Sequence, residues 1–149
     1  MELDKKDRLI LEALQTDARQ SLAALGKHIG LSQPAMSERV RKLEAAGVIE
    51  GYGARINLRS LGLTLQAIVR VRTTHAHIKS YVRLFEKMPE VLEADRVTGE
   101  DCFIVRCAFA EPQDLERLVD ALAEHGSVST SLVLSSAVRK RVSLQPKSL

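Results

Sequence analysis

The chain has 149 residues, of which 45% are hydrophobic, so it can form one domain or two small ones. Its net charge of +3 is compatible with a nucleic-acid partner but is too small to indicate one by itself. No apolar run reaches the roughly 18 to 20 residues that cross a bilayer, and the first residues lack the apolar core of a secretion signal, so we expect a cytoplasmic protein with no membrane partner.

The first predicted helix covers the segment from Leu3 to Leu14. Asp4 can act as its N-cap, and Asp7 falls in the first turn, where the helix dipole favours a negative charge. Its apolar residues suit one helical face, so we expect it to pack on the helices that follow.

The second predicted helix lies between an N-cap residue and a glycine that ends it. Ser21 can cap it, and Gly30 supplies the left-handed residue that ends it. Between them, Leu22, Leu25 and Ile29 recur at the spacing of one helical face.

A third helix is expected to start near Gln33. Ser32 is a good N-cap, Pro34 falls in the first turn, where no backbone donor is missed, and Gly47 ends the helix. Its buried face is defined by the apolar residues at spacing i, i+4 and i+7, namely Met36, Val40 and Leu43.

Two short helices around a glycine-led turn form a helix-turn-helix, whose second helix is built to lie in the major groove of DNA. A generic helical hairpin with a solvated charged face is the alternative. The residues of the turn, Gly30 and Ser32, and the basic cluster Arg39, Arg41 and Lys42 on the third helix favour DNA binding. The candidate DNA-contacting residues are Ser32, Gln33, Pro34, Ser37, Glu38, Arg39, Arg41 and Lys42.

The candidates on the third helix have different expected roles. Gln33, Pro34, Ser37 and Arg41 lie in the early turns or on the outward face, where side chains reach base edges. Lys42 is expected to contact phosphates. Arg39 lies nearer the buried edge, so it can either contact a phosphate or hold the domain together through an ion pair.

Residues 48–58 alternate loosely and contain two glycines, which predicts a short hairpin or wing beside the helices. Tyr52 and Arg55 can either contact a phosphate backbone or pack as ordinary wing residues. The segment from Leu58 to Leu63 is the expected linker.

Beyond the linker the apolar period changes to two, which is typical of strands. The order of predicted elements is β-α-β-β-α-β, a ferredoxin-like pattern with a four-stranded antiparallel sheet and two helices on one face. The expected elements are a strand over Leu65–Arg72, a helix over His77–Met88, strands over Val91–Thr98 and Cys102–Phe109, a helix from Pro112, and a strand over Val128–Val138.

The predicted strand from Cys102 to Phe109 carries apolar side chains on both faces. Two helices can cover only one face, so the other needs a further layer. The simplest source is the same sheet of a second copy, which predicts a homodimer or higher homo-oligomer. Two-fold related recognition helices would also suit the two half-sites of a palindromic operator.

An enzyme is the rival class, but no nucleophile signature surrounds Cys102 or Cys107, and both suit strand packing as reduced thiols. His75 and His77 lack further ligands at metal-binding spacing. We therefore expect no catalytic residue, no metal and no cofactor. A second alternative is an oligomeric small-molecule-binding module whose helical head engages a protein partner.

Short sequence motifs in a fixed order run along nearly the whole chain. They are Leu3-Asp4 with Asp7 and Ile10-Leu11, Leu31-Ser32, Arg39-Val40, Leu43-Glu44, Gly47-Val48-Ile49, Leu61-Gly62, and Val97 to Asp101. Individually these motifs are weak, but in this order and spacing the chain resembles the Lrp/AsnC family of leucine-responsive, or feast/famine, transcription regulators.

The resemblance implies a dimer that can assemble further, binds double-stranded promoter DNA, and responds to an amino acid or related metabolite bound between ferredoxin-like domains. It places the helix-turn-helix at about residues 23–42. It also implies an effector region that includes the turn Thr98, Gly99, Glu100 and Asp101. Gly99 would let backbone N–H groups approach a carboxylate, and Asp101 could accept from an ammonium, although a plain hairpin turn needs the same residue types.

The expected fold is α+β, with an N-terminal winged helix-turn-helix domain joined to a C-terminal ferredoxin-like domain. The expected boundaries are residues 1–57 for DNA binding, 58–63 for the linker, 64–138 for effector binding and oligomerisation, and 139–149 for a basic tail. Short tails of this kind are usually solvated or frayed, so we expect no additional DNA contact from it.

Overall fold

The structure is a computed structural model that describes residues 1–144. The chain forms two compact units. The N-terminal unit comprises residues 1–55 together with residues 138–144, and the sheet unit comprises residues 56–137. No helix within residues 1–144 is both long enough and apolar enough to cross a membrane.

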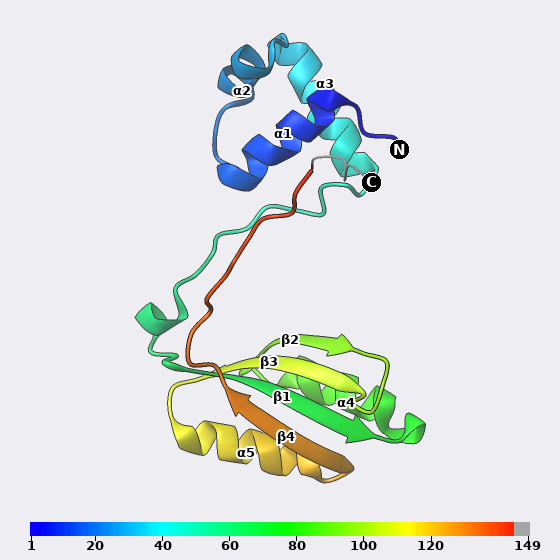
Figure 1. Ribbon diagram of the computed structural model, residues 1–149, viewed down its shortest axis with the longest axis vertical. Coiled ribbons are helices and arrows are strands. Elements are labelled where there is room, and N and C mark those ends of the chain that lie inside the picture. Colours follow the sequence, from blue (N-terminus) through cyan, green and yellow to red (C-terminus); the bar gives the residue numbers. More distant parts are fainter. Residues whose placement is uncertain (145–149) are drawn as a thin grey trace. The chain divides into compact units, whose positions relative to one another are not determined.

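Three helices make up most of the N-terminal unit: α1 (Lys5–Thr16), α2 (Leu22–Ile29) and α3 (Gln33–Ala45) (Figure 1). Each begins at the cap that the sequence predicts, and Gly30 ends α2 with a φ of 72°. Their apolar faces meet in one core, in which the side chains with no or almost no exposed surface are Ile10, Leu25, Met36 and Leu43.

The expected wing hairpin is wrong. The backbone N–H groups of Val48 and Ile49 donate to the Leu43 carbonyl at the end of α3, and residues 50–57 then run as an exposed chain without a strand. A two-stranded hairpin is marginal unless a third element covers it, and two glycines weaken this segment further. The expected linker forms a short 3₁₀ turn, Leu58–Leu61.

The tail is exposed over residues 139–143, as expected, but it is also hydrogen-bonded to α1, which the sequence did not predict. Arg8 donates from Nη1 to the Leu144 carbonyl at 2.8 Å, and the Gln15 amide both donates to and accepts from the Val142 backbone. Leu144 packs against the helical core because the tail offers an apolar side chain to α1. Residues 145–149 of the expected tail lie outside the described residues.

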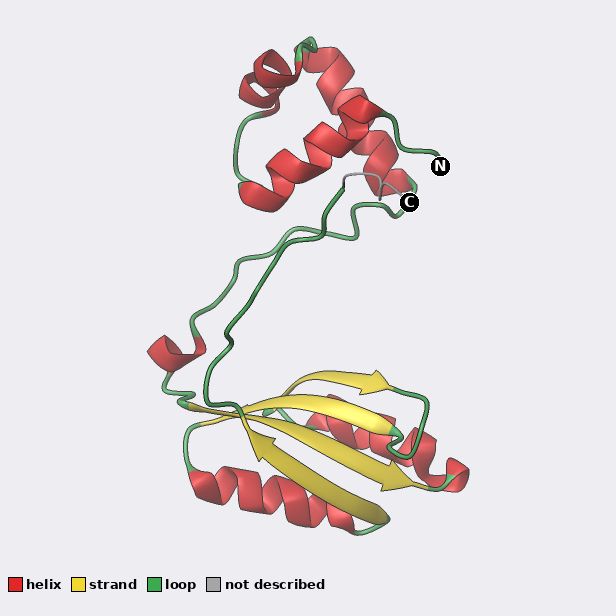
Figure 2. Cartoon of the chain, in the orientation of Figure 1, coloured by secondary structure: helices red, strands yellow, loops and turns green. Residues whose placement is uncertain are grey.

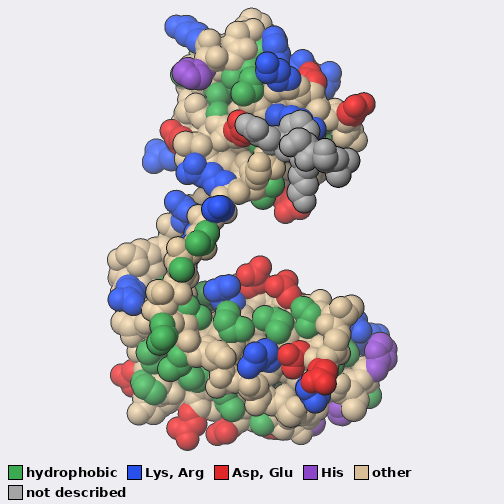
Figure 3. Space-filling model, in the orientation of Figure 1, with side chains coloured by type: hydrophobic (Ala, Val, Ile, Leu, Met, Phe, Trp, Pro, Cys, Tyr) green, Lys and Arg blue, Asp and Glu red, His purple; other side chains and the backbone are tan. Residues whose placement is uncertain are grey.

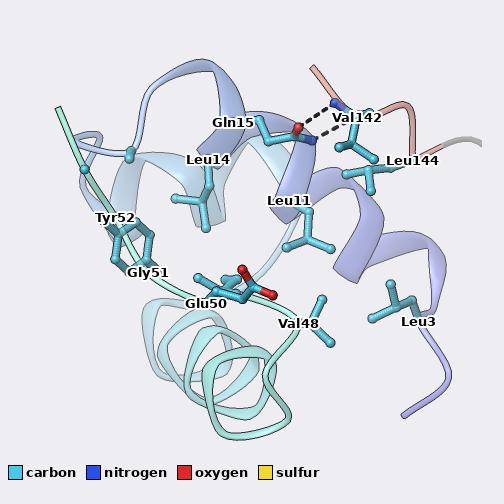
Figure 4. A pocket seen from close by; sticks show the side chains of 13 residues that line it. Leu3, Leu11, Leu14, Gln15, Val48, Glu50, Gly51, Tyr52, Val142 and Leu144 are labelled. Carbon is cyan, nitrogen blue, oxygen red and sulfur yellow. Dashed lines mark hydrogen bonds between the residues drawn. The ribbon is translucent and has the colours of Figure 1, made fainter. Parts of the chain in front are cut away.

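The tail borders a cavity of about 490 Å³ in the N-terminal unit (Figure 4). Its other walls come from α1 and from residues 48–53. Leu11 and Leu14 project from α1, and Glu50 and Tyr52 come from the extended segment. The residues after α3 and the tail therefore both belong to the packing of the helical unit.

The sheet unit contains β1 (Leu65–Thr73), β2 (Val91–Arg96), β3 (Phe103–Phe109) and β4 (Gly126–Leu132) in the antiparallel order β2-β3-β1-β4. The helices are α4 (Ile78–Lys87), which follows a 3₁₀ turn, His75–His77, and α5 (Pro112–Ala123). The predicted β-α-β-β-α-β order is confirmed (Figure 2).

The last strand ends earlier than expected, at Leu132 and not at Val138. Its partner β1 begins at Leu65, and Leu132 already pairs with Ala67 near that end. The Val133 N–H donates to the Gln66 carbonyl, after which no strand remains alongside to pair with.

The two faces of the sheet differ. Val69 and Val105 point to the core face, where they pack with α4 residues such as Phe85 and α5 residues such as Leu122. No helix of residues 56–137 covers the other face, and Figure 3 shows hydrophobic side chains among charged ones on the strand side of this unit. By strand alternation, the residues of this open face include Ile68, Arg70, Ile104 and Arg106.

Candidate nucleic-acid interface

The helix-turn-helix depends on a close approach between α2 and the turn. The Leu31 N–H donates to the Gly26 carbonyl at 2.8 Å, and a Cβ at Gly26 would lie 2.7 Å from the Leu31 oxygen and 3.0 Å from Met36. The sequence indicated no role for Gly26, because its position on α2 does not reveal that the Leu31 backbone and Met36 lie against it.

The outward face of α3 is open. Met36, Val40 and Leu43 are buried, so the opposite side of the helix projects from the unit. Of the candidates, Arg39 alone is half-buried, and the exposed ones are Ser32, Gln33, Pro34, Ser37, Glu38, Arg41 and Lys42. Ser32 also accepts from the Ala35 N–H as the helix cap, so its hydroxyl has a structural role.

An ion pair lies in the middle of this face. Arg41 donates from Nε to Glu38 Oε2 at 3.0 Å and from Nη2 to Glu38 Oε1 at 2.8 Å. The Lys42 ammonium lies 3.6 Å from the same carboxylate. The hydrogen bonds from Arg41 lower the pKa of Glu38 and raise that of Arg41. Both groups therefore remain charged at neutral pH.

Arg39 occupies the ion pair that was one of its two expected roles. Its Nη1 lies 2.7 Å from Asp4 Oδ2 and 2.7 Å from Asp7 Oδ1. Backbone donation from the Asp7 N–H and then hydrogen bonding from Arg39 lower the pKa of Asp4. The sequence identified Asp4 and Asp7 only as cap residues of α1, because their partner lies more than thirty positions further along the chain.

Tyr52 is held within the N-terminal unit. Its hydroxyl donates to Glu44 Oε1 at 2.8 Å, and partial burial together with that carboxylate raises the pKa of Tyr52 to about 12. Arg55 is exposed. Tyr52 was expected either to contact a phosphate or to pack within the unit, and in the structure it packs within the unit.

In the sheet unit, the four candidate effector residues lie together in the connection between β2 and β3. Gly99 adopts a φ of 113°, a conformation that favours glycine, and Asp101 is half-buried while the other three are exposed. Glu100 accepts from Arg72 Nη2 at 2.6 Å. Sequence reasoning missed Arg72, whose place beside the turn follows from the pairing of β1 with β3.

The residues considered for an enzyme take structural places. Cys107 is buried, which raises the pKa of its thiol to about 11, and Cys102 donates from Sγ to the Thr73 carbonyl. The imidazole of His77 stacks on that of His125, with ring centroids 4.7 Å apart. Across residues 1–144, no group of three or more His, Cys, Asp or Glu side chains is arranged to hold a metal.

A capped, outward-facing recognition helix in one unit and a four-stranded βαββαβ unit in the same chain define a helix-turn-helix transcriptional regulator with a separate ligand-binding domain. Family models agree: an AsnC-type helix-turn-helix domain matches residues 3–44, and the Lrp/AsnC ligand binding domain matches residues 66–143. The chain belongs to the Lrp/AsnC family and is a DNA-binding transcriptional regulator of that type.

Individual relatives cover almost the whole chain. The HTH-type transcriptional regulator YezC of Bacillus subtilis is 36% identical over 91% of this chain and 96% of its own length. The structure of LrpC from Bacillus subtilis superposes with a TM-score of 0.89 at 28% identity, over 94% of this chain and all of that one. A transcriptional regulator from Neisseria meningitidis, solved with L-methionine, gives a TM-score of 0.86 at 29% identity over 99% of this chain and 98% of that one.

Proposed function

We propose that this regulator binds promoter DNA by placing the outward face of α3 in the major groove. The exposure of that face, opposite a fully apolar buried one, is the observation that carries the proposal. Gln33, Pro34 and Ser37 lie in the first turns and reach base edges first, and Arg41 donates to a guanine. Lys42 neutralises phosphate charge.

Arg39 has a positioning role in this proposal. Its guanidinium joins α3 to Asp4 and Asp7 at the start of α1. These contacts hold the recognition helix at a fixed angle to α1. A phosphate contact by Arg39 would need to displace two carboxylates that already accept from it. Arg39 therefore supports DNA binding indirectly.

The functional form is a homodimer or a larger homo-oligomer that includes it. The open face of the sheet carries Ile68 and Ile104 beside Arg70 and Arg106, and a second sheet supplies the layer that the helices do not. Opposite charges on the same face, such as Glu93 beside Arg106, suit a polar rim around an apolar centre.

A small metabolite, of which an amino acid is the expected kind, modulates the DNA binding. The turn from Thr98 to Asp101 offers backbone N–H groups at Gly99 for a carboxylate and Asp101 for an ammonium. The Neisseria meningitidis relative with L-methionine supports this ligand class. The protein is a regulator and not an enzyme, and it acts in the cytoplasm, where promoter DNA lies.

Binding to duplex DNA over a salt series tests the proposal. Affinity for a random duplex, followed by fluorescence anisotropy, should fall steeply with salt, since each neutralised phosphate contributes a slope of about −0.9 in log K against log salt. Affinity that is absent, or independent of salt, would favour a helical head that engages a protein. Thermal-shift screening against the amino acids tests the ligand class, because a ligand of the native state raises the melting temperature.

A further inference from the structure

We propose that Glu38 determines the base specificity of α3 in two ways: it accepts from a cytosine amino group next to the guanine that Arg41 contacts, and it weakens binding to all other DNA. The inference rests on the proposed role of α3 in the major groove. It explains why a carboxylate lies on the outward face of α3, which otherwise suits DNA.

The position of Glu38 is unusual for such a surface. Its carboxylate lies on the outward face of α3 at 48% side-chain exposure and contacts both Arg41 and Lys42. Phosphate groups repel a carboxylate in the groove, and the carboxylate also loses water there, so its binding is unfavourable unless a hydrogen bond from a base offsets these costs. A Glu on a recognition helix therefore needs a base that donates.

Base chemistry selects the partner. In the major groove a carboxylate accepts from the cytosine N4 amino group, whereas guanine presents two acceptors to a bidentate Arg. Residues three apart on a helix are about 4.5 Å apart along its axis, close to the rise of about 3.4 Å between base pairs on one strand. With α3 lying along the groove as proposed, this spacing lets Glu38 and Arg41 reach neighbouring base pairs, one offering cytosine and the other guanine.

The pairing between the two side chains supports both tasks. Glu38 accepts from Nε and Nη2 of Arg41, which holds the guanidinium extended on the outward side of the helix before DNA arrives. On DNA without the cytosine, the Glu38 carboxylate stays paired with Arg41 or Lys42, so one positive charge is not available to a phosphate. The carboxylate also comes close to phosphates without a base that donates a hydrogen bond to it. Non-target affinity is then lower than the basic cluster alone would give.

The experiment uses the full chain and a pool of random duplexes. Wild type, Glu38→Gln and Glu38→Asp each select bound duplexes, and anisotropy measures their affinity for the wild-type-selected duplex and for unselected duplex over a salt series. Glu86→Gln on the exposed side of α4 is the control, because it removes the same charge from the sheet unit. Melting temperatures establish that each variant folds like wild type.

Wild type should select a cytosine beside a guanine. Glu38→Gln should retain the guanine and relax the preference for cytosine, because its amide can also pair with adenine. It should bind unselected duplex about three- to tenfold more tightly, with a salt slope steeper by about 0.9. The ratio of selected to unselected affinity should fall about 5- to 100-fold. Glu38→Asp keeps the charge but shortens the reach, so it should lose the cytosine without gaining affinity for unselected duplex. Glu86→Gln should behave as wild type.

Other outcomes overturn the inference. The readout role is removed by a wild-type site without cytosine beside guanine, or by Glu38→Gln and Glu38→Asp sites that both keep the cytosine as strongly as wild type. Equal loss of affinity for both duplexes would make Glu38 a support for helix structure only. If wild type binds no duplex at low salt, the proposed function itself fails, and that result is visible in the wild-type arm alone.

Discussion

The guanidinium of Arg39 lies 2.7 Å from the carboxylate of Asp7, which is 4% exposed and belongs to a helix more than thirty residues earlier in the chain. Asp4 accepts from the same nitrogen, and Asp4 and Asp7 cap α1 through each other's backbone N–H groups. The start of α1 and the middle of α3 are therefore one polar cluster. Through this cluster α3 is joined to the start of α1.

Arg39→Ala should destabilise the N-terminal unit, because it leaves the buried Asp7 carboxylate without its cationic partner and with only the Asp4 backbone N–H as a donor. We expect a loss of about 1–3 kcal/mol in the free energy of unfolding, less than for a fully buried pair since Arg39 is partly exposed. Urea unfolding followed by circular dichroism measures it. Arg41→Ala, on the exposed side of the same helix, should lower the stability much less, because solvent screens its ion pair with Glu38. Equal losses in the two variants would contradict a special role for Arg39.

Acid should weaken the same cluster. The folded state lowers the pKa of Asp4 from its ordinary value of 3.8, so the stability that Asp4 contributes is complete above that value and is lost as the pH falls through the lowered pKa. In Asp4→Asn, stability should fall less between pH 4 and the acid limit than in wild type. Urea midpoints over a pH series test this, and parallel curves for the two proteins would refute it.

Arg41→Ala should reduce binding to a selected duplex by about 1–3 kcal/mol, since a bidentate contact to guanine is lost. Binding to an unselected duplex should change little by comparison. Lys42→Ala is the matched variant: it should weaken binding to both duplexes alike and reduce the salt slope by about 1. A uniform loss for Arg41→Ala would make Arg41 a phosphate contact.

Removal of the chain from Val138 onward should destabilise the N-terminal unit. The truncation deletes hydrogen bonds from Arg8 and Gln15 and the packing of Leu144, so we expect a loss of about 1–3 kcal/mol. Thermal unfolding by calorimetry measures it. A chain that ends at Leu144 keeps all these contacts and should melt close to wild type. The prediction fails if both truncated chains melt alike.

Ile104→Glu should convert the oligomer to monomers, because it places a charge in the centre of the open sheet face. Light scattering coupled to size-exclusion chromatography measures the mass. Val82→Glu introduces the same charge at an exposed apolar residue of α4, on the helix side, and should leave the mass unchanged. A dimer that survives Ile104→Glu would mean that copies associate through another surface.

Local signals in the sequence predicted the helices and most strands. Ser21, Gly30 and Ser32 act on backbone groups within a few residues, so they define the helix-turn-helix without reference to the rest of the chain. The apolar spacing then determined which face of α3 is buried and which is free. The order of elements in the sheet unit was predictable because the apolar spacing of each strand and helix is also a local signal.

Only the tertiary structure decided the features that depend on a distant partner. The last strand ends at Leu132 because β1 has begun at Leu65, and the tail packs because α1 offers Arg8 and Gln15 to its backbone. Arg39 pairs with Asp7 for the same reason. Caps and periodicity act over one or two turns of chain, whereas strand ends and ion pairs depend on what folding brings alongside.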